Sequence, residues 1–214
     1  MTRNEPDRQY CGEPLGRRGV GDDPIALFAQ WFQEAIRTNR GPEYLPEVVA
    51  LATASADAEP SVRMVLLKGF DAEGCLFFTN YRSRKARDLS ANPRASMVLY
   101  WPWLHRQVRL SGHVVLASSA ESDAYFATRP RPSRLGAWAS AQSEPLDDEQ
   151  TLQRRMAEFD ARFADRDVPR PQQWGGYRLV PEEMEFWQGR PDRLHDRWLF
   201  RRAAAGWQVR RLAP

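Results

Sequence analysis

Short runs of apolar residues, separated by turn residues, recur along the chain and predict a mainly β protein. Residues 62–70 and 75–80 are rich in Val, Leu, Met and Phe, and the Asp-Ala-Glu-Gly segment between them predicts a β-hairpin. Residues 47–55 are expected to form the strand before this hairpin. Further strands are expected at 94–103, 106–117, 176–180, 184–188, 197–201 and 207–212.

Helical signals flank the predicted strands. Asp23 is a favourable N-cap with Pro24 in the first turn, and paired apolar residues then predict a helix that ends near Asn39. Further helices are expected from near Ser83, from the capping box formed by Ser118 and Glu121, at 135–140 and at 147–165, with a stiff basic turn at 129–134.

The order of these elements predicts one domain. Five strands precede residue 118, and they are linked by short turns and not by crossover helices, which favours an antiparallel barrel. Residues 1–22 are interpreted as a flexible N-terminal arm, and residues 23–214 as a single domain, mainly β with flanking helices.

Composition narrows the functional classes. The 214 residues include 42% hydrophobic side chains, eight Trp and ten Phe, as in a globular protein with a sizeable core. No apolar run is long enough to cross a membrane, and Cys11 and Cys75 are too few for a disulfide framework, so we expect a cytoplasmic protein. The net charge is only +3, because 28 acidic residues are interspersed among the 31 basic ones. This balance favours a small anionic ligand over nucleic acid.

The predicted hairpin carries polar groups that could form a phosphate site. Thr79, Ser83, Arg84 and Lys85 gather where its second strand gives way to a helix, and hydroxyls, cations and free N–H groups there suit an anion. An exposed basic turn beside an ordinary hairpin is the alternative.

Lys68 and Lys85 are the only lysines among the 31 basic residues, and both lie in this stretch, which adds weak support for the phosphate site. Arg63 and Lys68 lie within the first strand of the hairpin. They are five residues apart, so an ideal strand points them to opposite faces; either a bulge intervenes or they serve different ligands.

A second candidate segment lies at residues 185–200. Arg193, His195 and Arg197 share parity, so on an extended backbone they point the same way, and Trp187 precedes them as a wall for a flat ring. The alternative is a surface strand whose own aspartates neutralise it. Gln107 lies on the polar face of another predicted strand, where it either approaches a bound heterocycle or is half exposed.

Other chemistries lack their signatures. The three histidines have no metal-ligand spacing, and neither a hydrolase elbow, a P-loop nor a dinucleotide-binding glycine motif is present. A barrel with phosphate pockets and aromatic walls but no metal or nucleophile usually takes its reactivity from an organic cofactor.

Several segments resemble the pyridoxamine 5′-phosphate oxidase family, over essentially residues 23–214. They are RMVLLKGFD, FFTNYRSRKARDL, RQVRLSG, YFATRPRPSRLGAWASAQS, WGGYRLVPEEMEFWQGRPDRLHDRWLF and VRRLAP. The Arg-Gln-Val strand is shared by many FMN-binding split barrels. The combination of RPRPS, at residues 129–133, with RLHDR, at residues 193–197, is more specific. The resemblance implies an FMN-binding split β-barrel that forms a homodimer, with FMN between the subunits.

The resemblance also implies roles for individual residues. FMN would contact Arg63, Met64, Val65, Leu66, Leu67, Lys68, Phe78, Thr79, Ser83, Arg84, Lys85, Gln107, Gln142, Ser143, Trp187 and Arg197, in part from the other subunit. The substrate phosphate would meet Lys68, Tyr125, Arg129 and Ser133, and a lid would use Tyr10 and Arg8. Arg193 and His195 would be catalytic, over the pyridine ring of the substrate.

The implied reaction oxidises pyridoxamine or pyridoxine 5′-phosphate to pyridoxal 5′-phosphate. A hydride equivalent passes from C4′ to flavin N5, and O2 then reoxidises the flavin and yields hydrogen peroxide. Two departures from the family pattern are Asp7, near the expected lid arginine, and Phe78, where a tyrosine is often found. The alternatives are an FMN oxidase of another flat heterocycle, as in phenazine biosynthesis, and a flavin- or vitamer-binding protein without turnover.

Overall fold

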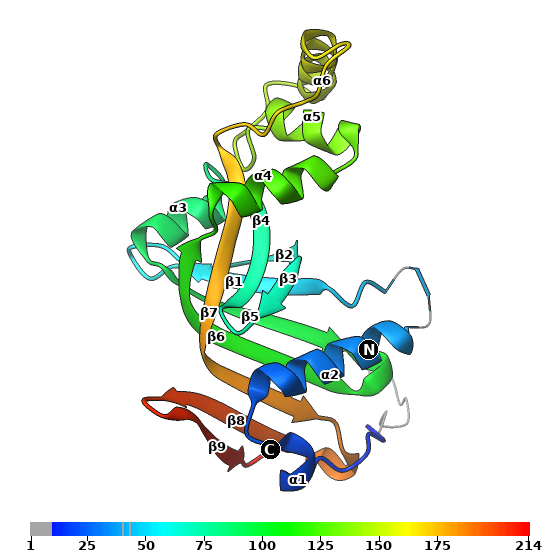
Figure 1. The fold of residues 1–214 in the computed structure, drawn as a ribbon, viewed down its shortest axis with the longest axis vertical. Helices are drawn as coiled ribbons and strands as arrows, with labels where there is room; N and C mark the ends of the chain where they lie inside the picture. Colours follow the sequence, from blue (N-terminus) through cyan, green and yellow to red (C-terminus); the bar gives the residue numbers. More distant parts are fainter. Residues whose placement is uncertain (1–9, 40, 43) are drawn as a thin grey trace, which may run out of the picture.

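One curled antiparallel sheet dominates the computed structural model, which describes residues 10–39, 41–42 and 44–214 (Figure 1). Its nine strands run in the order β2-β1-β5-β6-β7-β4-β3, and β8 joins β7 and carries β9. The strands are β1 Val48–Ala54, β2 Pro60–Leu66, β3 Gly69–Asp71, β4 Gly74–Asn80, β5 Arg94–Trp101, β6 Arg106–Leu116, β7 Trp174–Gln188, β8 Asp196–Ala203 and β9 Gly206–Leu212. This is the split-barrel fold expected from the sequence.

Helices gather at both ends of the sheet (Figure 1). At one end lie α4, α5 and α6; at the other, α1 lies beside β8 and β9, and α2 crosses the sheet between the two ends. The helices are α1 Arg17–Val20, α2 Pro24–Arg37, α3 Arg84–Ala91, α4 Ser119–Thr128, α5 Arg131–Ala139 and α6 Thr151–Arg162, with 3₁₀ turns η1 Pro102–Leu104 and η2 Pro191–Arg193. Among the described residues, none of the helices combines the length and the apolar character that crossing a membrane requires.

The long strand β7 connects the two parts of the sheet. It pairs with β6 along most of its 15 residues, while its first part pairs with β4 and its last part with β8. We expected two strands, at 176–180 and 184–188. Pro181, which has no N–H to donate to the ladder, lies in the gap between them. The strand continues through this gap, because Pro181 pairs with Gly112, Glu183 pairs with Ser111, and Glu182 between them is the extra residue of a bulge.

The predicted hairpin is wrong in its first strand. The chain leaves β2 at Leu66 and enters β3 at Gly69, so 62–70 is two strands. β2 pairs with β1, whereas only the three residues of β3 pair with β4. This break removes the parity conflict between Arg63 and Lys68, because they no longer belong to one extended strand.

The helix α2 closes the main core. Asp23 caps it as predicted, with its carboxylate accepting from the amide of Ile25 at 2.8 Å, and Phe28 and Trp31 are buried against the sheet. On β4, Cys75 is buried in the same core, and burial raises the pKa of its thiol to about 12.

The described part of the N-terminal arm is packed against the domain. Leu15 and Val20 belong to the main core. The amide of Leu15 donates to Asp196 at 3.1 Å, and its carbonyl accepts from the indole of Trp198 at 2.8 Å. The packed structure therefore begins before residue 23.

Two helical boundaries differ from expectation. The basic turn predicted over 129–134 is in fact the start of α5, because Pro130 and Pro132 sit at its N-cap and first turn, where no N–H donor is needed. As a result Ser133 is helical. The helix expected over 147–165 is shorter, Thr151–Arg162.

Replacing Gly74 with Ala should destabilise the fold. Gly74 has φ +136°, and a Cβ there would lie 2.1 Å from the carbonyl oxygen of Leu179 on β7. We expect a loss of about 2 kcal/mol or more in the free energy of unfolding, measured by urea denaturation. Gly136→Ala is the control, because a Cβ there meets nothing within 4 Å in helix α5, and it should be neutral or stabilising. Equal stability of the two variants would contradict this account.

Candidate functional site

A cavity of about 790 Å³ opens between β2, the end of β4, and the helices α3, α4 and α5. Its volume lies within the range of small-molecule and cofactor sites. Most of the predicted ligand-binding residues line it: Arg63, Met64, Val65, Leu66, Lys68, Phe78, Thr79, Arg84, Lys85, Tyr125, Arg129, Ser133, Gln142 and Ser143. Leu67 is instead buried in the main core, and Ser83 is buried behind Lys85.

Lys85 is the centre of a cation cluster at the N-terminus of α3. Its ammonium donates to three neutral oxygens, on Thr79 at 3.0 Å, Ser83 at 3.3 Å and Gln142 at 2.9 Å. Burial, with the charge of Arg63 nearby, lowers the pKa of Lys85 to about 8. Within the described chain Lys85 makes no ion pair, so an anionic ligand would supply the missing negative charge.

Arg63 is oriented by hydrogen bonds to residues on β1 and, through them, on α3. Its guanidinium donates to Thr53 at 2.7 Å, and the hydroxyl of Thr53 donates in turn to the buried carboxylate of Asp88 at 2.6 Å. Burial lowers the pKa of Arg63, and the charge of Arg84 adds to this, while Asp88 opposes it. Asp88 therefore positions this cation without closing off the cavity.

The opposite wall of the cavity is aromatic. Phe78 stacks between Tyr125, at 4.1 Å between ring centroids, and Trp174, at 5.5 Å. The guanidinium of Arg129 lies over Trp174 at 4.6 Å, and its buried Nη1 has no hydrogen-bond partner among the described residues. A desolvated cation with an unused donor is expected where an anion binds.

The remaining predicted residues form a second cluster, which is outside this cavity. Gln107, Trp187 and Arg197 are neighbours in one row across β6, β7 and β8. The buried carboxylate of Glu185 accepts from Arg197 at 2.7 Å and from Arg109 at 3.2 Å, which fixes the arginine in this row.

Tyr10 and His195 complete the second cluster. The ring of Tyr10 meets Trp187 and His195 edge to face, at 5.2 and 5.3 Å, and Trp187 lies 4.6 Å from His195. Burial lowers the pKa of His195, and the charges of Arg193 and Arg197 lower it further. Arg8, the other predicted lid residue, lies outside the described residues.

The shared parity predicted for residues 193, 195 and 197 is wrong as a description of the backbone. Pro191 begins the turn η2, and Asp192 and Arg193 have φ of 55° and 58°, so β8 starts only at Asp196. The side chains still lie close enough for both arginines to depress the pKa of His195.

The two clusters lie at different ends of β7. Trp174 lines the cavity and Trp187 belongs to the second cluster. Trp187 lies 13 positions further along the strand, a path of about 43 Å at 3.3 Å per residue. Sequence reasoning missed Trp174 and Asp88. Trp174 precedes a glycine pair at the start of a strand, and Asp88 lies on the inner face of a helix; neither pattern marks a ligand site.

A split barrel with a cation-lined cavity defines a class of ligand-binding barrel proteins, and comparison with known proteins places the chain more narrowly. Residues 42–163 match the family model described as pyridoxamine 5′-phosphate oxidase. Residues 174–214 match the model described as the pyridoxine 5′-phosphate oxidase C-terminal dimerisation region. The chain belongs to the pyridoxamine 5′-phosphate oxidase family.

Relatives and solved structures agree with this assignment. A pyridoxine/pyridoxamine 5′-phosphate oxidase of Rubrobacter xylanophilus is 53% identical over 97% of this chain and 94% of its own. One from Pseudomonas paraeruginosa is 49% identical over the whole of both chains. PhzG from Burkholderia lata 383, solved with tetrahydrophenazine-1-carboxylic acid, has a TM-score of 0.87 at 34% identity and covers 95% of this chain and 99% of its own.

Proposed function

We propose that this chain is a cytoplasmic, homodimeric, FMN-dependent oxidase. It would convert pyridoxamine and pyridoxine 5′-phosphate to pyridoxal 5′-phosphate, with O2 as the final acceptor and hydrogen peroxide as the second product. The observation that carries the proposal is the pairing of two cationic groups in one cavity. The first group is Lys85 with its neighbours, and the second is Arg129 above the ring of Trp174. Two separate cationic groups in one cavity fit two ligands that each carry a phosphate.

The two groups would divide the ligands between them. Arg63, Arg84 and Lys85 would hold the FMN phosphate at the N-terminus of α3, where the helix dipole also favours an anion. Lys68, Arg129 and Ser133, with Tyr125, would hold the substrate phosphate on the other side of the cavity. When bound, FMN supplies a ring that accepts a hydride equivalent.

His195 would act in its neutral form. Burial and the charges of Arg193 and Arg197 lower its pKa, which favours the neutral ring, and its Nδ1 accepts from the amide of Arg190 at 3.1 Å, which leaves the proton on Nε2. An Nε2–H donor beside the cation of Arg193 suits the ring oxygen of a phosphopyridine, where negative charge is stabilised during oxidation.

The separation of the clusters supports a homodimer in which each site takes residues from both copies. A single chain keeps Trp187 far along β7 from the cavity, so a second copy would have to bring Gln107, Trp187 and Arg197 to it. The exposed side of β2 offers an apolar surface for such contact: Val62 is 70% exposed and Met64 is 61% exposed.

A second candidate function remains, because PhzG shares the fold closely at 34% identity and its solved complex holds a phenazine compound. This chain would then oxidise another flat heterocycle. The buried Nη1 of Arg129, which has no hydrogen-bond partner in the described part of the chain, and the nearby Ser133 favour a substrate with a phosphate. A protein that binds flavin or vitamer without turnover is the third outcome.

Peroxide release separates these functions. FMN-loaded protein given pyridoxine 5′-phosphate should consume O2 and release one peroxide per pyridoxal 5′-phosphate formed.

Arg193→Ala should lower turnover by about 100-fold or more while the protein stays yellow, because the lost cation acts on the reacting ring. Arg210→Ala, an exposed arginine on β9, is the control and should keep full activity. Full activity of Arg193→Ala would remove that residue from the mechanism.

FMN affinity should fall as pH rises above about 8. Lys85 must be protonated to hold the phosphate, and its pKa in the free protein is about 8, so each further pH unit should raise Kd by up to about tenfold. Titration of apoprotein with FMN from pH 7 to 9.5, followed by flavin fluorescence, measures this. Lys85→Arg keeps the charge and should show a flat profile; an equal slope in both proteins would rule out Lys85 as its source.

Mixed dimers test whether the site is shared. Lys85→Met removes one cluster and Arg197→Met the other, so each variant alone should lose FMN affinity and activity. Random mixing makes half of the dimers hybrid, and one of the two sites in each hybrid is intact, which restores about a quarter of wild-type activity. Lys85→Met with Arg84→Met is the control pair and should restore nothing. Activity no higher than that of the control pair would contradict a shared site.

A further inference from the structure

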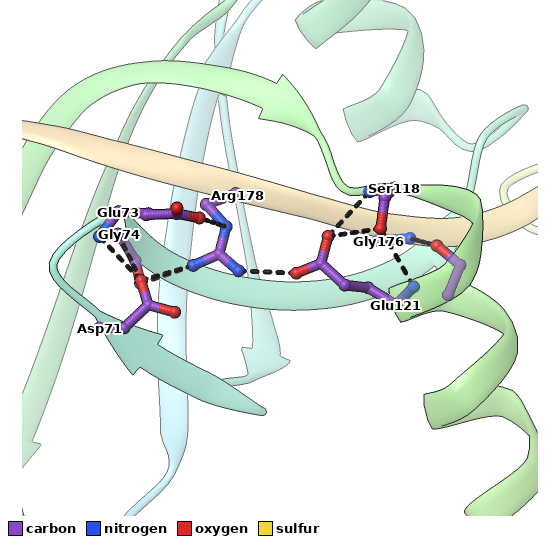
Figure 2. Close-up of polar contacts among 8 residues, drawn as sticks. Asp71, Glu73, Gly74, Ser118, Glu121, Gly176 and Arg178 are labelled. Atoms are coloured by element: carbon purple, nitrogen blue, oxygen red, sulfur yellow. Dashed lines mark hydrogen bonds and ion pairs between the residues drawn. The ribbon is translucent and has the colours of Figure 1, made fainter.

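We propose that Arg178, which lies outside the ligand cavity, is a positioning residue for the substrate-phosphate pocket. It lies on β7 and joins two elements from different parts of the chain through their carboxylates (Figure 2). One element is the β3–β4 turn that follows Lys68, and the other is the N-terminus of α4, the helix that leads to Arg129. The inference rests on the proposed function, which assigns those two cations to the substrate phosphate.

On one side Arg178 holds the β3–β4 turn. Its Nη1 donates to Asp71 at 2.7 Å, and the same carboxylate oxygen accepts from the amides of Glu73 at 2.8 Å and Gly74 at 3.1 Å (Figure 2). β3 has only three residues, so few ladder hydrogen bonds fix it. The ion pair therefore adds a link at the turn end of β3, beside the backbone bond from the amide of Lys68 to the carbonyl of Leu76 at 2.8 Å and the packing of Phe70 on the core.

On the other side Arg178 holds the first turn of α4. Its Nη2 donates to Glu121 at 2.7 Å, and the second oxygen of that carboxylate accepts from the amide and hydroxyl of Ser118, at 2.9 and 2.8 Å (Figure 2). In addition, the hydroxyl of Ser122 accepts from the amide of Gly176 at 3.1 Å. The capping box thus does two things, because it caps the N-terminus of α4 and, through Glu121 and Arg178, docks that end on β7.

This docking sets the position of the phosphate-binding residues. Tyr125 lies one helical turn after Glu121 on the same face, and Arg129 is the C-cap residue. A ten-residue helix is about 15 Å long, so a tilt of about 4° at its docked end moves the far end by about 1 Å. A displacement of that size is enough to spoil a charge-assisted contact to phosphate.

The exposure of the two carboxylates makes the positioning role of Arg178 separable from folding. Arg178 is 8% exposed, whereas the side chains of Asp71 and Glu121 are 52% and 39% exposed. Without the arginine, both carboxylates can hydrate, and an apolar chain of similar length can occupy the buried space. The capping contacts between Glu121 and Ser118 also stay in place.

The test compares Arg178→Met with the matched control Arg201→Met. Arg201 lies on the neighbouring part of the same sheet and makes an ion pair with Glu183 at 2.6 Å, but it is largely exposed and far along the chain from the cavity elements. FMN-loaded proteins are titrated with pyridoxal 5′-phosphate without turnover, and binding is read from tryptophan fluorescence. FMN affinity of the apoproteins and thermal stability are measured alongside.

We expect Arg178→Met to raise the Kd for pyridoxal 5′-phosphate about tenfold or more, with FMN affinity within about threefold of wild type. Arg201→Met should change neither. Glu121→Gln keeps the cap but weakens the charged contact, and should show a smaller rise in the same Kd.

Three results would overturn the inference. An unchanged Kd for pyridoxal 5′-phosphate in Arg178→Met would leave the proposed function standing and remove the positioning role. A parallel loss of FMN affinity, vitamer affinity and thermal stability would make the network merely structural. Failure of wild-type protein to bind pyridoxal 5′-phosphate would overturn the proposed function and this inference together.

Discussion

One strand, β7, constrains the whole arrangement. It is hydrogen-bonded to β6, β4 and β8, so the two parts of the sheet cannot move apart without breaking its ladders. Its length puts Trp174 and Trp187 at opposite ends of a 15-residue strand. The same strand carries Arg178 near its start and Glu185 near its end. Arg178 binds Glu121 on α4, beside the cavity, and Glu185 binds Arg197 in the second cluster. Because the cavity and the second cluster are far apart within one chain, the proposed site requires a second copy of the chain.

Desolvated positive charge is the second theme. Lys85 is surrounded by neutral oxygens, Arg63 is only partly offset by Asp88, and Arg129 lies on aromatic rings. Such an arrangement costs stability in the free protein, because the charges repel each other and have lost water. A bound anion offsets that cost, and any ligand that binds only the folded state raises its stability by mass action.

The sequence contained enough information for the fold class and for most of the cavity. Alternating apolar patterns located the strands, and the residues between Arg63 and Lys85 fall together because β2, β4 and α3 meet there. What local patterns could not reveal were the breaks in continuity. Leu67 turns into the core between two strands, Pro191 starts a turn where an extended segment was expected, and Pro181 does not end β7. At Leu67 and Pro181 long-range packing or pairing decided the outcome over local propensity, whereas at Pro191 a local turn breaks the extended backbone that the parity argument assumed.

The buried thiol on β4 has a consequence for chemical durability. Oxidants attack the thiolate form of cysteine, and a pKa of about 12 leaves Cys75 almost wholly protonated at neutral pH. The core also denies access, since the residue is 2% exposed. The proposed oxidase would generate peroxide beside its own barrel, and burial would keep this sulfur out of reach of that by-product, so ageing by oxidation should begin elsewhere on the chain.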